Sequence, residues 1–291
     1  MKKLLIIISA AILVACNPTA KLPSIQTAAD AAFEASDYNK AYTLYSEYIT
    51  LAKANKVDVD GQMLIKQAQS CAQIDKVDEA AAIYNGLLEN EANIKLLAEY
   101  AQMLQSNGRA DEELALWQTH ADKLKDANLL KLKSERLIFL NASKENYESI
   151  IAAYETKGEA QLSKEAELEY VKALEATKKG SAALKACNNL LKANPNYTDA
   201  NEWKAKYYYE KAENRYKYEM AKYNKNKNAT TYAYLRRDLK KVSADFRIAR
   251  DLFIKLRKDD PNNKSYIRYL KNTYLRLDQK DKAAQMDKLL K

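Results

Sequence analysis

Residues suited to the crossing of two packed helices recur along this chain at intervals of roughly 34 residues. The interval is clearest near the carboxyl end, between Ala249 and Ala283. The full series of such positions is 41, 80, 113, 150, 183, 249 and 283. A period of this length is typical of a chain built from repeated units, each burying its apolar face only against its neighbours. We therefore expect an array of repeats rather than one globular core.

The apolar residues around these positions follow a helical pattern. Ile267, Leu270 and Tyr274 precede Ala283 and follow one another at intervals of three and four, which places them on one helix face. The chain has only five Gly and four Pro among its 291 residues, so turns that need a positive φ are few and helix breakers are rare. The composition and the spacing together predict an all-α protein.

The order of these residues resembles the tetratricopeptide repeat (TPR) family. Phe253 and Pro261 stand at the fourth and twelfth positions after Ala249, and the same template fits Ala183 with Cys187 and Pro195. The resemblance covers roughly residues 25–291, although Glu and Ile replace the small residue at positions 113 and 150. It implies helix-turn-helix units stacked in a right-handed superhelical solenoid with a concave face, and it implies protein binding rather than catalysis.

One interval departs from the period, because nearly two periods separate Ala183 from Ala249. Either a further repeat is hidden there or one repeat has elongated helices. Residues 199–223 contain no Gly or Pro, and the Asn-rich stretch 224–231 interrupts the apolar pattern, so we favour elongation. Two helices, over residues 199–223 and 232–258, would each be about 39 Å long against about 20 Å for an ordinary helix of the family. We expect this antiparallel hairpin to project from the solenoid.

The expected hairpin is rich in Tyr, Lys and Arg. Tyr and Arg are enriched at the energetic centres of protein interfaces, because rings bury large areas at small rotamer cost. Two alternatives stay open: the Tyr side chains fill the core between the two helices, and the cations form a solvated face. The candidate partner-binding residues are Tyr207, Tyr216, Tyr218, Lys222, Tyr223, Lys225, Lys227, Tyr232, Tyr234, Arg236 and Arg237.

The amino-terminal segment that ends at Cys16 has the layout of a secretory signal. Lys2 and Lys3 precede an apolar run over residues 4–15, which is too short for a permanent membrane span. Residues 13–16, LVAC, resemble the lipobox of bacterial lipoproteins, which implies cleavage before Cys16 and attachment of a diacylglyceryl group to its thiol, with palmitate among the acyl chains. The alternative is a buried amino-terminal helix with an incidental Cys. Lipoproteins of enteric bacteria that stay in the inner membrane typically have Asp after the Cys, so with Asn17 there the resemblance implies the outer membrane, facing the periplasm.

These features give an expected division of the chain. Residues 1–15 are a lipoprotein signal peptide, 16–24 a flexible, lipidated tether and 25–197 the amino-terminal TPR-like repeats. Residues 198–260 form the elongated hairpin repeat, and 261–291 form a carboxy-terminal repeat or cap.

The residues needed for common catalytic chemistry are scarce. His120 is the one His, so a His-based triad would have to use that residue, and we interpret it as an ordinary surface or packing residue. A zinc site with His ligands is not expected, and the five Gly stand alone, so no phosphate-binding loop can be assembled. We expect no catalysis, no metal, no cofactor and no small-molecule substrate. Cys71 and Cys187 lie in different repeats, and we interpret them as free, buried packing residues rather than as a disulfide.

The positive charge is concentrated in the carboxy-terminal part. Residues 201–291 hold 25 Lys or Arg against 12 Asp or Glu, a net charge of +13, which leaves −4 of the total +9 for the rest of the chain. With the anchor, this predicts a membrane-anchored scaffold of the cell envelope that binds other envelope proteins through its groove and its hairpin. The alternative is a binder of an anionic envelope polymer or lipid headgroup. Nucleic acid is not an expected partner, because a secreted lipoprotein rarely meets it.

Overall fold

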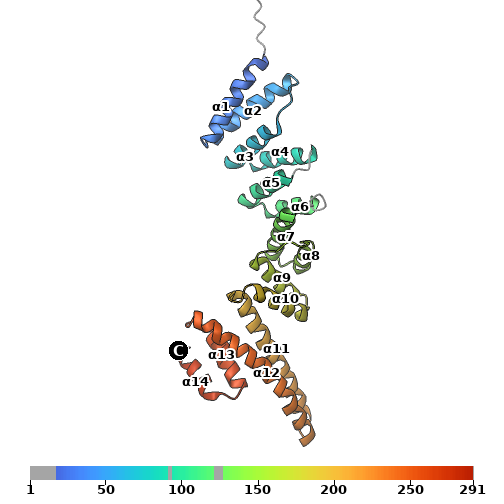
Figure 1. Cartoon of the computed structure of the whole chain (residues 1–291), viewed down its shortest axis with the longest axis vertical. Coiled ribbons are helices and arrows are strands. Elements are labelled where there is room, and N and C mark those ends of the chain that lie inside the picture. The colour runs from blue at the N-terminus through green and yellow to red at the C-terminus, as the bar shows by residue number, and fades with distance from the viewer. Residues whose placement is uncertain (1–17, 91–93, 121–126, 291) are drawn as a thin grey trace, which may run out of the picture. The chain divides into compact units, whose positions relative to one another are not determined.

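The computed structural model describes residues 18–90, 94–120 and 127–290. The predicted signal peptide and Cys16 lie outside these ranges. The described residues form α-helices, one short 3₁₀ helix and no strand, which confirms the all-α prediction (Figure 1). None of their helices combines the length and the apolar character that a membrane crossing needs. The chain divides into two compact units, residues 1–125 and 126–291, and each is described by itself.

The first unit contains three pairs of packed helices. Residues 18–24, predicted as part of a flexible tether, are helical instead. Pro23 falls in the first turn of a helix, where its missing N–H costs no hydrogen bond, and Leu22 is buried against the first helix pair. The elements are η1 (Pro18–Lys21), α1 (Leu22–Glu34), α2 (Tyr38–Ala54), α3 (Gly61–Gln73), α4 (Val77–Asn90), α5 (Ile94–Ser106) and α6 (Ala110–Thr119).

The second unit contains four further pairs, one of them much longer than the rest. Its elements are α7 (Ala127–Ala142), α8 (Tyr147–Glu155), α9 (Lys164–Ala176), α10 (Gly180–Ala193), α11 (Thr198–Lys225), α12 (Ala229–Asp259), α13 (Lys264–Arg276) and α14 (Lys280–Lys288).

The seven predicted crossing positions are all buried in the second helix of a pair. Five of them are Ala, and their exposed fractions run from 0% to 3%. The two exceptions are also buried, since Ile150 and Glu113 are each 1% exposed. The Glu113 carboxylate accepts a hydrogen bond from the Trp117 indole N–H at 3.1 Å, which gives a buried polar group a partner. The period read from the sequence therefore marks the packing of real helix pairs.

In six of these pairs, the turn between the two helices has the same backbone geometry. The residue five before the crossing position has a positive φ, between 55° and 68°. The N–H of the next residue donates to the carbonyl five residues earlier, at 2.8–3.0 Å. This is the Schellman ending of a helix, which satisfies carbonyls at its last turn. The left-handed residues are Ser36, Asp75, Gly108, Glu145, Lys178 and Asp278.

The seventh pair, α11 and α12, is the elongated hairpin. Its helices have 28 and 31 residues, or about 42 and 46 Å at 1.5 Å per residue, so the elongation is confirmed and no extra repeat is hidden among the described residues of this interval. The second helix begins three residues before the predicted start, because Asn228 caps it. The Asn228 side chain accepts from the Thr231 N–H, and the Thr231 hydroxyl accepts from the Asn228 N–H, which satisfies two donors of the first turn.

The residues buried between the two hairpin helices form its seam, and they are apolar near the base and partly charged near the turn. Near its base, Ala205 and Ala212 of α11 leave room for the large rings of Phe246 and Phe253 on α12. Closer to the turn, the buried positions are Leu235 and two carboxylates, Glu219 at 3% exposed and Asp238 at 8%. The end of the hairpin therefore has a thinner apolar core than its base.

The two described cysteines are free and buried, as predicted. Burial raises the pKa of the Cys71 and Cys187 thiols to about 11, which keeps them protonated and poorly nucleophilic at neutral pH. Their role is packing.

Candidate interaction surfaces

The end of the hairpin carries most of the predicted partner-binding residues. We call residues 218–237 the hairpin tip. The stretch between Glu219 and Asp238 includes no Asp or Glu, but it includes five cations. Those cations, Lys222, Lys225, Lys227, Arg236 and Arg237, are all exposed. The tip is thus a concentrated positive surface.

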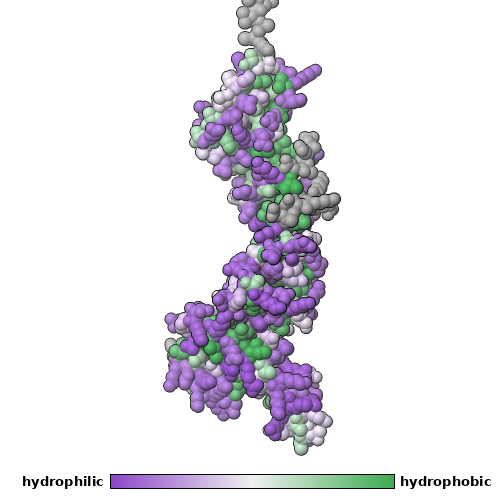
Figure 2. Space-filling view, viewed as in Figure 1, coloured by the Kyte–Doolittle hydropathy of each residue, from purple (hydrophilic) through white to green (hydrophobic). Residues whose placement is uncertain are grey.

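Aromatic rings lie among these cations. Tyr218, Tyr232 and Tyr234 are 58%, 50% and 51% exposed, and the rings of Tyr223 and Tyr232 join the two helices with centroids 5.9 Å apart. The Arg237 guanidinium lies over the Tyr234 ring at 5.3 Å. In Figure 2 the end of the hairpin is paler than its strongly hydrophilic flanks. Rings and guanidinium groups stacked in this way present a flat, amphipathic surface.

The tip offers a surface rather than a ligand pocket. The hollow lined by Lys222, Tyr223 and Tyr234 has a volume of about 30 Å³, about the volume of one water molecule in the liquid. Beyond α13 and α14, the ends of α11 and α12 extend as a pair (Figure 1). A partner would therefore lie against the tip.

Two predicted residues do not lie at the tip. Tyr207 packs near the base, where its ring stacks on Trp203 with centroids 5.3 Å apart. Tyr216 is half-buried, and the Arg276 guanidinium lies over its ring at 4.1 Å. Tyr216 also packs against the buried residues between the two helices, as the core-filling alternative expects. The Tyr207 ring instead lies on Trp203 of its own helix.

Charges at the inner end of the tip are matched within the hairpin. Arg215 lies 2.5 Å from the buried Glu219 carboxylate, and Arg237 lies 3.2 Å from that of Asp238. The Arg237 guanidinium holds the pKa of the Asp238 carboxyl below its usual range. These pairs neutralise the two seam carboxylates, so the charge the tip presents to solvent is positive.

The first unit has a groove of a different chemistry, between the first helices of two successive pairs, α3 and α5. It has a volume of about 270 Å³, and amide side chains of Gln69, Gln73 and Gln102 line it. Oε2 of Glu99, also in the lining, is buried without a hydrogen-bond partner among the described residues. The repeat pattern predicts a groove but does not identify these residues. Gln69 and Gln73 are four residues apart on one helix, and that spacing of amides was the available signal.

No metal site is evident in the part of the chain that the structure describes. His, Cys, Asp and Glu side chains do not gather there in groups of three or more as metal ligands would. His120 ends α6 as its C-cap residue.

Comparisons with known proteins bear on the fold. No protein-family model matches the chain, and no curated protein matches it. Among solved structures, the C-terminal part of a TPR repeat-containing protein from Cytophaga hutchinsonii matches with a TM-score of 0.54 and 16% identity, over 91% of this chain and 93% of that one. A tetratricopeptide repeat protein from Parabacteroides merdae matches with a TM-score of 0.45 and 16% identity, over 87% and 99%. With its helix pairs and buried crossing residues, the first likeness shows that this chain has the TPR-type helical-repeat fold.

Proposed function

We propose that this protein is a lipid-anchored, non-catalytic scaffold of the bacterial cell envelope, and that it binds other envelope proteins through the hairpin tip. The observation that carries the proposal is the tip itself. Three half-exposed Tyr side chains and five exposed cations occupy the end of a helix pair that extends beyond α13 and α14 (Figure 1). Aromatic and Arg side chains held on rigid helices are suited to bind a protein surface of opposite charge.

The anchor half of the proposal rests on the amino-terminal sequence. Cys16 is six residues before the first residue of α1, and six residues span at most about 20 Å. A lipid on Cys16 would hold the first helix pair close to the bilayer surface. Two or three acyl chains, each worth about 0.8 kcal/mol per buried CH₂, make such an anchor stable.

Crosslinking in living cells tests the partner. A photoreactive residue at position 232 should capture one or a few envelope proteins, whereas the same residue at position 185, exposed on α10, should not. The quadruple variant Lys222→Glu, Lys225→Glu, Arg236→Glu and Arg237→Glu should lose the capture. Recovery of only lipid or polysaccharide, with binding that weakens steeply as salt rises, would favour the polymer-binding alternative instead.

Metabolic labelling tests the anchor. An alkyne analogue of palmitate should label the wild-type chain, and Cys16→Ser should abolish the label and release the protein from the membrane fraction. Separation of the two membranes on a density gradient should place the labelled protein in the outer membrane. Equal labelling of both forms would refute lipidation at Cys16.

A further inference from the structure

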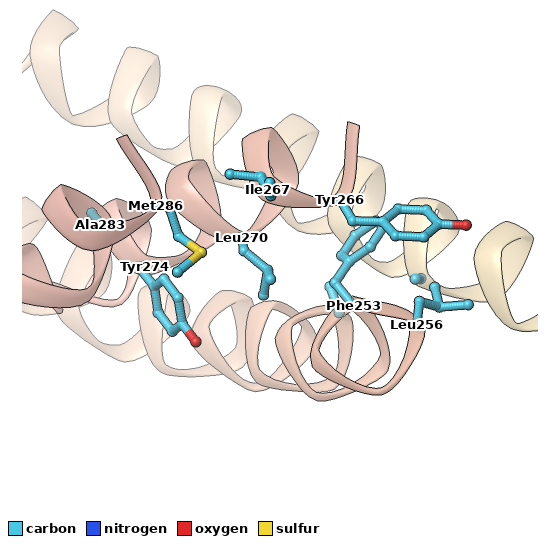
Figure 3. Close-up of a cluster of buried hydrophobic side chains, with 10 residues drawn as sticks. Phe253, Leu256, Tyr266, Ile267, Leu270, Tyr274, Ala283 and Met286 are labelled. Carbon is cyan, nitrogen blue, oxygen red and sulfur yellow. The ribbon is translucent and has the colours of Figure 1, made fainter. Parts of the chain in front are cut away.

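The last two repeats contain a pocket that is separate from the hairpin tip. It lies between α12, α13 and α14, with a volume of about 400 Å³, and we call it the carboxy-terminal pocket. Its apolar lining includes Ile254, Leu270, Tyr274 and Met286. Figure 3 shows Tyr274 and Met286 close together at one end of the buried cluster, with Leu270 between them and Phe253. An opening of this volume can accept one large side chain.

The polar lining of this pocket is positive. Arg257, Lys258 and Lys282 line it, and no Asp or Glu does. None of the three forms an ion pair within the described residues. Arg257 donates to the Pro261 carbonyl and contacts the Met286 sulfur, and Lys282 lies 5.7 Å from the Tyr274 ring centroid.

The carboxylates near the pocket do not neutralise these cations. Asp251 pairs with Arg250, and Asp287 pairs with Lys271. Asp259 and Asp281 are exposed and lie outside the lining. The pocket therefore combines an apolar floor with unmatched positive charge at its edge.

A second pocket in the same unit allows the charged residues of two linings to be compared. It lies between α8, α9 and α10, with a volume of about 490 Å³. Its lining includes a carboxylate, Glu167, which accepts a hydrogen bond from the Tyr154 hydroxyl. Its cations also have partners, since Lys157 donates to the Ala160 carbonyl and Lys164 lies over the Tyr197 ring. Arg257 and Lys282 of the carboxy-terminal pocket have partners of the same two kinds. The two pockets therefore differ in the carboxylate, which is present in the lining of the second pocket and absent from that of the carboxy-terminal pocket.

We propose that the carboxy-terminal pocket binds an acidic peptide segment of a partner protein. One large apolar side chain of the segment would lie on Leu270, Tyr274 and Met286. Flanking carboxylates would accept charge-assisted hydrogen bonds from Arg257, Lys258 and Lys282, which are stronger than neutral ones. The proposal depends on this pocket and not on the hairpin tip, so either surface can fail its test without affecting the other.

Methionine methyl groups give a direct test in the full chain. Four of the five methionines lie at separate places: Met63 in the first core, Met103 in the α3/α5 groove, Met220 on the hairpin and Met286 in this pocket. With ¹³C-methyl methionine, a blocked hexapeptide of sequence Asp-Glu-Phe-Leu-Glu-Asp should shift the Met286 signal and leave Met63 in place. The same peptide with Lys at the four acidic positions should shift nothing at Met286.

A double variant tests the charge, with a matched control. Lys258→Gln with Lys282→Gln should weaken the peptide on the order of tenfold, from the loss of two ion pairs. Lys192→Gln is the control, because Lys192 is exposed on α10 at the same distance from its crossing residue as Lys258. That variant should bind as the wild type does. Circular dichroism verifies that each variant is folded.

Three results would overturn the proposal. The first is a Met286 signal that the acidic peptide does not move at millimolar concentration. The second is a folded double variant with wild-type affinity. The third is a shift of Met286 by phosphatidylglycerol vesicles but not by the peptide, which would assign the pocket to lipid.

Discussion

The α9/α10 repeat and the elongated α11/α12 pair follow one another in the chain. Each buries an Ala where its two helices cross, but the turns between the two helices differ. The ordinary repeat turns at Lys178, whose φ of 61° belongs to a Schellman ending. The elongated pair turns later, at an Asn228 capping box. The buried residue four positions after the crossing Ala also differs. It is Cys187 in the ordinary repeat and Phe253 in the elongated pair.

This difference separates a structural part of the molecule from a part available for binding. A helix inside the stacked repeats contacts a neighbour on each side, as α9 contacts α8 and α10, so its buried face is committed to packing. The hairpin base obeys the same rule, with Phe253 in contact with α13 residues such as Tyr266. The tip extends beyond α13 and α14 (Figure 1), so charged seam residues and exposed rings are tolerated there.

The largest expected effect concerns the base of the hairpin. Phe253→Ala should destabilise the second unit by about 3–5 kcal/mol, since it removes a fully buried ring and leaves a cavity. Cys187→Ala, at the same register position of the ordinary repeat, removes one sulfur atom and should cost about 1 kcal/mol. Urea unfolding followed through the Met286 methyl signal measures both. Equal costs would contradict the view that the hairpin base supplies the main core.

The next effect depends on pH. Arg276 donates to both Glu213 oxygens, at 2.7 and 2.6 Å, and this holds the pKa of the Glu213 carboxyl below its usual range. A lowered pKa in the folded state stabilises the protein above the ordinary Glu value of about 4.3, and the gain is lost as pH falls through the folded value. Glu213→Gln should therefore cost about 1–2 kcal/mol at pH 7 and less at pH 3.

The control for this prediction is Glu210→Gln, an exposed carboxylate on the same helix. Urea midpoints at the two pH values give the comparison. A Glu213→Gln cost that stays constant with pH would show that packing, rather than the ion pair, holds α13 to the hairpin.

A smaller effect is expected at the seam of the tip. Amide protons of residues 218–237 should exchange faster than those near Phe246, because few apolar side chains close that end. Glu219→Leu should slow the exchange, with a gain of about 1 kcal/mol, since a buried carboxylate is replaced by an apolar group and Arg215 remains solvated. Hydrogen exchange with mass spectrometry measures both. Faster exchange in the variant would mean that the buried charge pair stabilises the turn.

The smallest effect on stability should accompany the largest loss of binding. Tyr232→Ala with Tyr234→Ala removes two half-exposed rings, so the unfolding free energy should change by less than about 0.5 kcal/mol. Crosslinking from position 218 should nevertheless lose its captured protein. Retained capture would move the binding surface away from these rings.

Several features could be predicted from the sequence because they depend on periodic residue types. The burial of Ala183 and Ala249 followed from their place in the helical pattern, and elongation followed from the absence of Gly and Pro over residues 199–223. The helical start at Leu22 departs from the predicted tether, because Pro23 is compatible with the first turn of a helix. Tyr207 and Tyr216 could not be told from Tyr232, since residue type alone does not give exposure.

The sequence by itself determined the helical class, the repeat period and the place of the elongated pair, because each depends on local spacing along the chain. Tertiary structure decided which side chains remain available. The residues with a positive φ in the turns are as different as Ser36 and Lys178. The packing of the two helices, rather than the residue type, therefore sets the backbone conformation there. The carboxy-terminal pocket likewise brings Lys258 of α12 to the same opening as Lys282 of α14. Charges on separate helices become one surface only when the helices pack, and no spacing within a single helix encodes that.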